Sequence, residues 1–312
     1  MSTVTAFAPA TVANVGPGFD VFGFALAGVG DTVEVRRRAR PGARLVGVVG
    51  DGGRLPREAA KNVASAVVMK MLKAVDARFG VEVTLRKGLP LGSGLGSSAA
   101  SAVAAAVASN GLLGGRFSDE ELLEFSRYGE KVACGAAHAD NVASALLGGF
   151  TIVRSYEPLE VVRLTVPDRW HAAVVHPHFD LPTKKARSAL PGRVPLAALT
   201  ANVGNAAALV AAIAKRDCAL FGRCLMGDAV VEPARAGLIP GYAEVRRAAL
   251  AAGAAGVAIS GAGPSLVALT NGRRVADMVG RKMAAVWQER GIGADIHVSR
   301  VGAPGARILT EE

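Results

Sequence analysis

The segment from residue 90 to residue 98 has the residue types and spacing of a phosphate-binding loop. It runs Pro90-Leu91-Gly92-Ser93-Gly94-Leu95-Gly96-Ser97-Ser98, between a predicted strand and a predicted helix. Three glycines at alternate positions let backbone N–H groups converge on one point, and the following helix adds its free N–H groups and the positive end of its dipole. Ser97 and Ser98 add hydroxyls that could contact a phosphate or a metal ion.

Two well-known phosphate loops do not fit this segment. A Walker A loop requires Gly-Lys-Ser/Thr, and the segment has no lysine. A Rossmann loop requires GxGxxG, whereas this segment reads GxGxG followed by serines. A glycine-rich turn that only packs is the structural alternative, but packing alone explains poorly a pattern that continues to Ser101.

Two other segments combine glycine, proline and polar residues. Residues 9–20, PATVANVGPGFD, hold two glycines around a proline, with Asn14 and Asp20 as polar members. Residues 260–265, SGAGPS, include Gly261 and Gly263 and lie between two predicted strands. Such sequences predict tight, defined loops that bring the backbone close to a ligand.

The hydrophobic pattern predicts an α+β protein, because helices and strands mix without strict βαβ alternation. We expect strands at residues 4–9, 21–26, 32–36, 81–86, 150–153, 171–175, 256–260, 266–270 and 294–301. We expect helices at residues 63–75, from 98 to about 108, at 118–134, 138–147, near 183, and at 200–214, 218–230, 242–252 and 273–289. A change of composition near residues 155–170 predicts two domains, residues 1–160 with the phosphate loop and residues 161–312.

The composition is that of a folded protein: of 312 residues, 51% are hydrophobic and 20% are charged. The net charge of +10 suits an anionic partner such as ATP or a nucleic acid. The densest basic run, Arg36–Arg40, has no interleaved aromatic residues, and we expect it to be a solvated sheet edge. Three cysteines without a CxxC pair predict neither a disulfide framework nor a zinc site.

The sequence also predicts a cytoplasmic protein without a membrane partner. No signal peptide is predicted at the N-terminus. The apolar stretches Ala99–Ala108 and Ala206–Ala214 are too short to span a bilayer, so we expect them to be buried helices.

The phosphate-loop segment resembles that of the GHMP kinase family, and the segments 9–20 and 260–265 resemble two further motifs of this family in the same order. The resemblance covers essentially the whole chain. It implies an N-terminal part like the second domain of ribosomal protein S5, with a left-handed βαβ unit, and a ferredoxin-like C-terminal part. It also implies that ATP and substrate bind between the two parts, and that the protein is a homodimer.

Within this family, residues 8–20 and His138-Ala139-Asp140-Asn141-Val142 are most similar to the members that phosphorylate L-homoserine. The resemblance therefore implies ATP- and Mg²⁺-dependent phosphorylation of the side-chain hydroxyl of L-homoserine, giving O-phospho-L-homoserine in threonine biosynthesis. It assigns nucleotide binding to residues 90–98, Gly261 and Gly263. Asn62 and Lys87 are weaker candidates for the nucleotide side, with a helix cap and a surface lysine as their structural alternatives.

The resemblance assigns Mg²⁺ to Glu130 and Ser98, and Mg²⁺ typically takes only one or two protein carboxylates. Without the resemblance, Glu130 would be a solvated helix glutamate that pairs with Arg127 or Lys131.

Catalysis is expected to need no dedicated base. Some family members use an aspartate about eleven residues after the metal glutamate, and here that position is Asn141, whose amide cannot accept a proton. Phosphoryl transfer tolerates this absence because positioning and charge stabilisation supply most of the acceleration. Asp140 is a rival base. His138 is expected to orient the substrate, with a structural histidine as the alternative.

The substrate expected from the resemblance is a zwitterion with a hydroxyl group. Arg187 and Arg235 match the family's carboxylate-binding arginines, and an arginine fork suits a carboxylate. Arg187 is also expected among the catalytic groups. Thr183 shares a helix face with Arg187, because the two residues are four apart. Asp20 and Asn14 can receive the substrate ammonium.

Three alternatives remain open at this point. A family member acting on mevalonate or a sugar would leave Asp20 without an ammonium to bind. A non-catalytic nucleotide sensor is disfavoured because the chain keeps both Glu130 and the phosphate loop. A nucleic-acid-binding protein predicts a basic face, whereas the basic residues are spread along the whole chain. We expect no nucleic-acid partner.

Overall fold

Two long strands form the centre of the first sheet in the computed structural model, which describes residues 2–311. In β1 (Thr3–Ala13) and β2 (Phe22–Arg38), alternate residues such as Val33 and Val35 face the core, as expected for strands covered on one side. The loop between them, residues 14–21, contains the glycine–proline motif that was expected near a ligand.

The first sheet has seven strands in the order β11-β1-β2-β4-β3, and β5 pairs with the start of β2 and with β6. Its other strands are β3 (Gly42–Val49), β4 (Gly80–Arg86), β5 (Phe150–Tyr156), β6 (Leu159–Leu164) and β11 (Arg307–Glu311). β3 and β4 are parallel neighbours with a helix between them in the chain, so a βαβ unit is present, and its left-handed connection stays a prediction.

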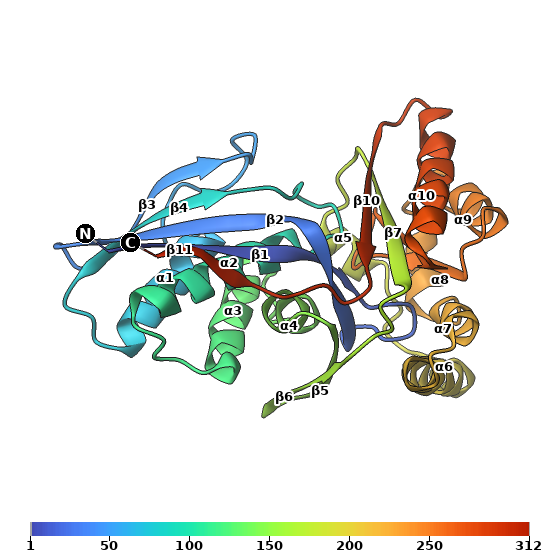
Figure 1. The fold of residues 1–312 in the computed structure, drawn as a ribbon, viewed down its shortest axis with the longest axis horizontal. Coiled ribbons are helices and arrows are strands. Elements are labelled where there is room, and N and C mark those ends of the chain that lie inside the picture. The colour runs from blue at the N-terminus through green and yellow to red at the C-terminus, as the bar shows by residue number, and fades with distance from the viewer. Residues whose placement is uncertain (1, 312) are drawn as a thin grey trace.

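Four helices lie on one side of this sheet (Figure 1). They are α1 (Val63–Ala74), α2 (Ser97–Leu112), α3 (Asp119–Cys134) and α4 (Asp140–Leu147). α2 packs against β1 and β2, and its many alanines allow this close approach because they are small. The two predicted helix starts are confirmed: Asn62 caps α1, and Ser118 and Glu121 form a capping box at α3.

The second sheet has four strands in the order β10-β7-β9-β8, and all its pairs are antiparallel. The strands are β7 (Trp170–Pro177), β8 (Gly256–Ile259), β9 (Leu266–Asn271) and β10 (Ala294–Arg300). The helices of this part are α5 (Thr183–Ser188), α6 (Leu196–Lys215), α7 (Cys218–Leu225), α8 (Val231–Ala236), α9 (Tyr242–Ala251) and α10 (Arg273–Gln288). If these strands are numbered 1 to 4 in chain order, they read 4-1-3-2 across the sheet, which is the expected ferredoxin-like topology.

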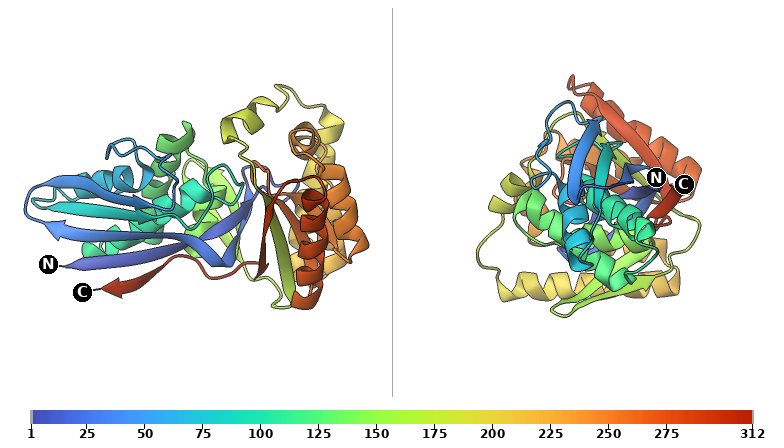
Figure 2. Two further views of the ribbon diagram at one scale, coloured as in Figure 1. Left: turned by 90° about the horizontal axis from the view of Figure 1, so that it is seen from above. Right: turned by 90° about the vertical axis from the view of Figure 1, so that its left-hand side faces the viewer.

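The chain crosses between the two sheets more than once. β6 pairs with β5, and β11 pairs with β1, so residues before and after 160 both belong to the first sheet. We call the first sheet with its helices the first lobe, and the second sheet with its helices the second lobe. As a result of the pairing of β1 with β11, the two termini lie together at the end of the first lobe that is far from the second lobe (Figure 2). The division of the chain at residue 160 stays a prediction.

The expectation that the basic run marks a sheet edge is wrong. β4 pairs with β2 from Thr32 to Arg38, so the run begins in a central strand. Arg36 nevertheless reaches solvent beside Glu82, because the face of the sheet opposite the helices is open to water. The prediction of two short strands is also wrong, since β2 continues without a break through Gly28 and Gly30.

The strands β3, β6 and β11 were not predicted from the sequence. Every residue of β11 is exposed, and β3 and β6 are mostly exposed or half-buried. Their pairing partners in the sheet stabilise them, and this cannot be deduced from a local pattern.

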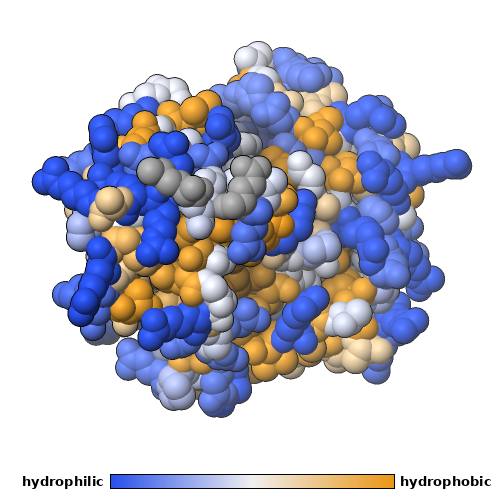
Figure 3. Space-filling view, turned by 60° about the vertical axis from the view of Figure 1, so that its left-hand side comes forward, coloured by the Kyte–Doolittle hydropathy of each residue, from blue (hydrophilic) through white to orange (hydrophobic). Residues whose placement is uncertain are grey.

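Figure 3 views the molecule with the first-lobe side brought forward and shows hydrophobic surface across its middle, bordered by hydrophilic side chains.

The expectation of a buried helix at Ala206–Ala214 is wrong, whereas that for Ala99–Ala108 is confirmed in α2. α6 begins earlier, at Leu196, and only Leu209, Ala212 and Ile213 are buried. Within residues 2–311 it is the one helix long and apolar enough, by length and composition, to cross a membrane. The helix predicted at 218–230 ends at Leu225, as α7, and α8 was not predicted. The helix predicted from His138 begins at Asp140.

Candidate active site

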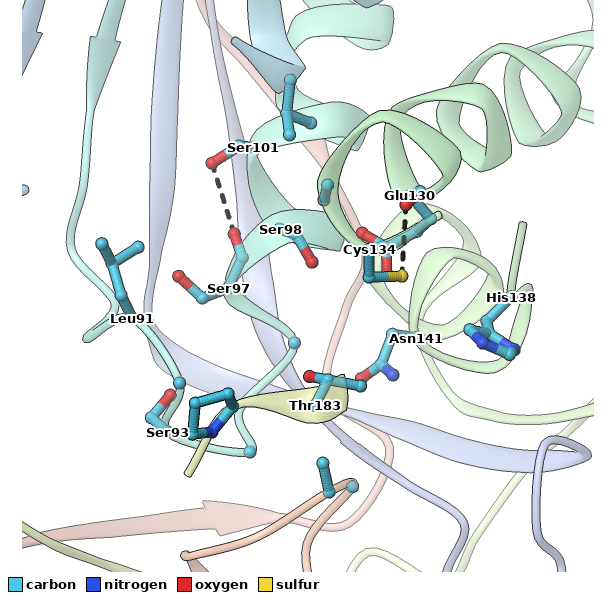
Figure 4. Close-up of a pocket in the computed structure, with 18 of the residues that line it drawn as sticks. Leu91, Ser93, Ser97, Ser98, Ser101, Glu130, Cys134, His138, Asn141 and Thr183 are labelled. Carbon is cyan, nitrogen blue, oxygen red and sulfur yellow. Dashed lines mark hydrogen bonds between the residues drawn. The ribbon is translucent and has the colours of Figure 1, made fainter. Parts of the chain in front are cut away.

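A cavity of about 640 Å³ lies where the phosphate loop meets the second lobe (Figure 4). The residues that line it come from residues 14–20, the segment before α1, the end of β4, the phosphate loop, α3, α4, α5, α8 and the segment 260–265. Most of the predicted site residues are among them. Pro90, Leu95 and Gly263 do not line this cavity, and Leu95 is fully buried in the core.

The phosphate loop has the left-handed backbone that its glycines predict. Gly92, Gly94 and Gly96 have φ values of 67°, 77° and 68°, and α2 begins immediately afterwards at Ser97. Ser93 holds the loop by donating to the Pro90 carbonyl at 2.9 Å. The free N–H groups at the start of α2 thus lie at the cavity, which is the arrangement expected for binding an anion.

The segment 260–265 packs directly on the phosphate loop. The Ser260 hydroxyl donates to the Gly94 carbonyl at 2.8 Å, and the Ser265 hydroxyl donates to the Ser93 carbonyl at 2.6 Å. A Cβ atom at Gly94 would lie 2.5 Å from the backbone carbonyl oxygen of Ser260, so no larger residue fits there without movement. Two of the three predicted motifs are therefore in contact.

The third motif joins the same assembly. Asn14 donates to the Gly261 carbonyl at 2.7 Å, and its own oxygen accepts from the backbone N–H of Asp20 at 3.1 Å. Asn14 and Asp20 both have positive φ values, 68° and 57°, which non-glycine residues rarely adopt. The surrounding contacts hold this strained turn in place, as is common at functional sites. Since the Asn14 side chain is engaged in this way, ammonium binding by Asn14 stays a prediction.

Lys87 is not a surface lysine, so that alternative is wrong. Its ammonium is buried against the Asp31 carboxylate and also donates to Ser97 O at 2.8 Å and Ser101 Oγ at 3.0 Å. Asp31 in turn accepts from the backbone N–H groups of Gly88 and Leu89. Burial lowers the pKa of Lys87, and the Asp31 charge opposes this effect. All three donors of Lys87 are used, so its geometry favours a role in holding the phosphate loop against α2.

Asn62 likewise uses its side chain within the protein. It accepts from Ala64 N and donates to the Pro56 carbonyl, each at 3.1 Å, and it is almost fully buried. Asn62 therefore fixes the segment before α1, which lines the cavity through Leu55, Pro56 and Lys61. A direct contact of Asn62 with the nucleotide stays a prediction.

Glu130 and Ser98 lie together at the cavity, and Figure 4 shows the Ser98 hydroxyl directed toward Glu130. Glu130 is buried, and within residues 2–311 its Oε1 atom has no hydrogen-bond partner. Burial raises the pKa of Glu130 to about 7, and the Ser98 hydroxyl and the Lys87 charge oppose the rise. A buried carboxylate oxygen without a partner is a chemically suitable ligand for Mg²⁺. The described residues contain no cluster of three or more acidic, His or Cys ligands, so a metal here would complete its shell with phosphate and water oxygens.

Asn141 and Asp140 form the start of α4 beside the phosphate loop. Asn141 Oδ1 accepts from the Thr11 hydroxyl at 2.7 Å, and its Nδ2 atom lies 3.4 Å from Asp140 Oδ1. Burial raises the pKa of Asp140 to about 7, with a further contribution from the Asp20 charge. Asp140 Oδ1 already accepts the backbone N–H of Asn141 at 2.8 Å.

His138 lies beside a cluster of charged groups. Its Nδ1 atom is 3.4 Å from Arg187 Nη2, which can only donate, and this contact favours the tautomer with the ring proton on Nε2. Burial, foremost, lowers the pKa of His138, which favours the neutral ring. Nε2 is buried and has no partner in the part of the chain that the structure describes. His138 can therefore donate a hydrogen bond from Nε2 to a ligand.

Two arginines and one aspartate face each other around the Phe19 ring. Arg187 and Arg235 lie 5.1 and 5.3 Å from the centre of this ring, and Arg187 donates to Asp20. Arg235 is buried and donates to the carbonyls of Ala186 and Gly261. Burial lowers the pKa of Arg235, and the nearby Arg187 charge is the second cause of this shift. Two arginines against one aspartate suit an anionic group such as a carboxylate. Thr183 lines the same cavity at the start of α5.

Several residues of the site were missed at the level of sequence. Thr11 and Phe19 lie inside the recognised segment 9–20, so they could have been found by asking what each of its side chains contacts. Asp31 and Tyr156 had no such signal. The Tyr156 hydroxyl donates to the Asp20 carbonyl at 2.7 Å and so holds the turn from a distant strand.

Comparison with known proteins agrees with this geometry. The models "GHMP kinases N terminal domain" and "GHMP kinases C terminal" match residues 61–149 and 209–289. A homoserine kinase from Chlorobaculum tepidum is 45% identical over 99% of both chains. One from Arabidopsis thaliana is 42% identical over 98% of this chain and 85% of that protein.

Solved structures show the same relationship. The crystal structure of homoserine kinase from Cytophaga hutchinsonii superposes with a TM-score of 0.95 at 47% identity, over 98% of this chain and 97% of that chain. A mevalonate kinase from L. major, at 16% identity and a TM-score of 0.72, shares the fold. Fold and site thus define an enzyme that transfers a phosphoryl group. The chain belongs to the GHMP kinase family, and the expected fold is confirmed.

Proposed function

We propose that the enzyme transfers the γ-phosphoryl group of ATP to the side-chain hydroxyl of L-homoserine. The observation that carries this proposal is that one cavity contains the phosphate loop, the Ser98–Glu130 pair, and the Asp20, Arg187 and Arg235 charges. The similarity to homoserine kinases over nearly the whole chain supports the choice of acceptor.

The charged groups can bind a zwitterionic amino acid at two points. The Arg187 and Arg235 guanidinium groups suit its carboxylate, and the Asp20 carboxylate suits its ammonium. Arg187 Nε is buried without a partner among residues 2–311, as is His138 Nε2. A bound substrate would satisfy both atoms, which otherwise remain costly in a buried site. Binding at two points directs the side-chain hydroxyl toward the phosphate loop.

The chemical step is a direct displacement at phosphorus. The acceptor hydroxyl oxygen forms a bond to the γ-phosphorus as the bond from that phosphorus to the β–γ bridging oxygen breaks, and ADP leaves. The hydroxyl proton passes to an oxygen of the transferred phosphoryl group and then to water, so no side chain has to act as a base. The loop N–H groups stabilise the charge on the phosphates. Mg²⁺, held by Glu130 and Ser98, would neutralise further phosphate charge.

The first experiment measures ADP release from Mg-ATP with L-homoserine, compared with mevalonate, galactose, L-serine and no acceptor. Turnover with L-homoserine well above the others is expected. Equal or faster turnover with another acceptor would retain the kinase and reject the proposed substrate. ATP binding without turnover for any acceptor would favour a nucleotide sensor. The threonine pathway and a cytoplasmic location stay predictions of the family resemblance.

We also propose that the protein is a homodimer that covers the exposed face of α6. Leu196, Leu199 and Val203 on this face, and Val194 just before the helix, are 44–76% exposed, and the helix carries no charge from Leu196 to Ala214. A chain with net charge +10 repels its own copy, so an uncharged face is the favourable place for self-association. The opposite side of α6 packs on α7, which disfavours a lipid environment around the whole helix.

Light scattering should give twice the chain mass, and Leu199→Asp with Val203→Asp should give the monomer with α-helix content retained. Glu244→Lys, an exposed change on α9, is the control and should stay dimeric. A monomeric wild type would reject this proposal, and binding of the wild type to phospholipid vesicles would favour a membrane partner instead.

A further inference from the structure

Thr11 lies at the point where β1, the phosphate loop and α4 meet. It is fully buried, and its backbone N–H donates to the Leu95 carbonyl within the phosphate loop at 3.0 Å. Its hydroxyl donates to Asn141 Oδ1 at 2.7 Å. A single residue of β1 is thus joined to the loop expected to bind phosphate and to the amide expected to face the acceptor hydroxyl.

The packing at this point leaves no room for a side chain at Gly96. A Cβ atom at Gly96 would lie 2.0 Å from Thr11 Oγ1 and 2.8 Å from Asn141 Oδ1. These distances show that the Gly96 backbone lies directly beside the hydrogen bond between Thr11 and Asn141, and its φ of 68° favours glycine as well. The position of the amide is therefore fixed relative to the last glycine of the phosphate loop.

The orientation of the Asn141 amide is fixed as well. A hydroxyl can donate or accept, so Thr11 alone would permit either orientation of the amide. Asp140 Oδ1 decides between them: it accepts the backbone N–H of Asn141 at 2.8 Å, which favours Oδ2 as the oxygen that carries any proton of this carboxyl group, so that Oδ1 stays an acceptor. Asn141 Nδ2 lies 3.4 Å from that oxygen, and a reversed amide would place two acceptors against each other.

We propose that Thr11 is a positioning residue, which holds the Asn141 amide so that its NH₂ group is presented to the reacting oxygens. Rotation of the amide is blocked by Thr11 on one side and Asp140 on the other. The NH₂ group then donates to the acceptor hydroxyl oxygen or to an oxygen of the transferred phosphoryl group. This inference deepens the proposed function, on which it rests, by extending the catalytic arrangement to a buried residue of β1.

The test uses two variants of Thr11 and one matched control. Thr11→Val removes the hydroxyl at constant shape, and Thr11→Ser keeps it. Thr270→Val removes another fully buried hydroxyl, which donates to the His171 carbonyl far from the cavity. We expect Thr11→Val to lower kcat by about 10- to 100-fold with little change in the KM for ATP, because a small misplacement of a catalytic group is costly. Thr11→Ser should stay within about threefold of the wild type, as should Thr270→Val.

A double-mutant cycle with Asn141→Ala separates positioning from simple loss of stability. If Thr11 acts through Asn141, then Thr11→Val should change kcat by less than about twofold once the amide is gone. Additive losses in the cycle, or a Thr11→Val enzyme with kcat near that of the wild type, would overturn the proposal.

A measurement without turnover keeps the inference testable if the proposed substrate is wrong. The side-chain amide signal of Asn141 in a ¹⁵N NMR spectrum is identified by its absence in Asn141→Ala. It should shift in Thr11→Val and stay in place in Thr270→Val. An unmoved signal in Thr11→Val would reject the positioning role. A shifted signal together with no turnover on L-homoserine would reject the substrate and retain the positioning role.

Discussion

Arg187 donates from a single nitrogen, Nη2, to both carboxylate oxygens of Asp20, at 2.9 and 3.0 Å. His138 Nδ1 lies 3.6 Å from the same carboxylate. The Arg187 and Asp20 charges thus compensate each other in the cavity. A zwitterionic substrate offers each of them a replacement partner: its carboxylate for Arg187 and its ammonium for Asp20. Substrate binding would therefore exchange one ion pair for two.

Asp20→Asn should accordingly weaken the binding of L-homoserine. The amide cannot compensate the substrate ammonium, and loss of one partner of a desolvated charge pair costs about 2–5 kcal/mol. The KM for L-homoserine should rise by at least about 30-fold, and that for ATP should change by less than about threefold. Steady-state kinetics measures both constants. Asp168→Asn, which breaks an exposed ion pair with Arg300, is the control and should change neither. An unchanged KM in Asp20→Asn would favour an acceptor without an ammonium group.

Gly94→Ala should weaken ATP binding. An added Cβ would lie 2.5 Å from the Ser260 carbonyl oxygen, and the residue would also have to keep a φ of 77°. The loop has to move, so we expect ATP affinity to fall by at least about tenfold in calorimetric titration. Gly28→Ala is the matched control, because Gly28 has a φ of 86° but nothing within 4 Å of an added Cβ. It should cost about 1 kcal/mol of stability and leave ATP affinity unchanged. Equal affinities in the two variants would contradict the assignment of this loop to phosphate binding.

The fold was largely predictable where a local pattern was strong. The alanine-rich helix after the phosphate loop, the capping box at Ser118 and the strands β7 and β9 all lie near their expected positions. The errors in the first sheet concern pairing between distant segments. β11 is fully exposed and is stabilised by pairing with β1, and no feature of residues 307–311 predicts that partner.

The site shows the same limit. The glycine loops and Glu130 could be located from residue types and from family resemblance, because short continuous segments of the sequence contain the residues that identify them. The buried Lys87–Asp31 pair could not, because its partners are 56 residues apart and their meeting depends on the pairing of β2 with β4. Thr11 and Asn141, separated by 130 residues, illustrate the same point.

Variants of Asn141 and Asp140 test whether a base is needed. Asn141→Asp introduces a carboxylate next to Asp140, where it repels both its neighbour and the phosphates, so kcat should fall by at least about tenfold. Asp140→Asn keeps the oxygen that accepts the Asn141 N–H, so kcat should fall by no more than about tenfold, whereas loss of a general base costs about 10²–10⁴-fold. The pH dependence of kcat in both variants completes the measurement. A higher kcat in Asn141→Asp, or a loss beyond 10²-fold in Asp140→Asn, would show that a base participates.

Glu232 should make stability depend on pH. It is buried at the start of α8, where it contacts the Tyr242 hydroxyl and accepts from Ile259 N at 3.2 Å. Burial raises the pKa of Glu232 from 4.5 to about 7. The folded state therefore keeps this proton up to about pH 7, and the unfolded state releases it near pH 4.5. The stabilising contribution is fully present below pH 4.5 and is lost as the pH rises through about 7.

Glu232→Gln removes this dependence while its amide can still accept from Ile259 N and donate to the Tyr242 oxygen. Relative to the wild type, the variant should gain roughly 3 kcal/mol between pH 4.5 and 7, since each pKa unit corresponds to about 1.36 kcal/mol. Chemical denaturation at a series of pH values measures the difference in unfolding free energy between the two proteins, which cancels the other titrating groups. Glu58→Gln, at an exposed carboxylate, is the control and should give a nearly flat difference. A flat difference for Glu232→Gln as well would mean that the folded protein hydrates this carboxylate and leaves it charged.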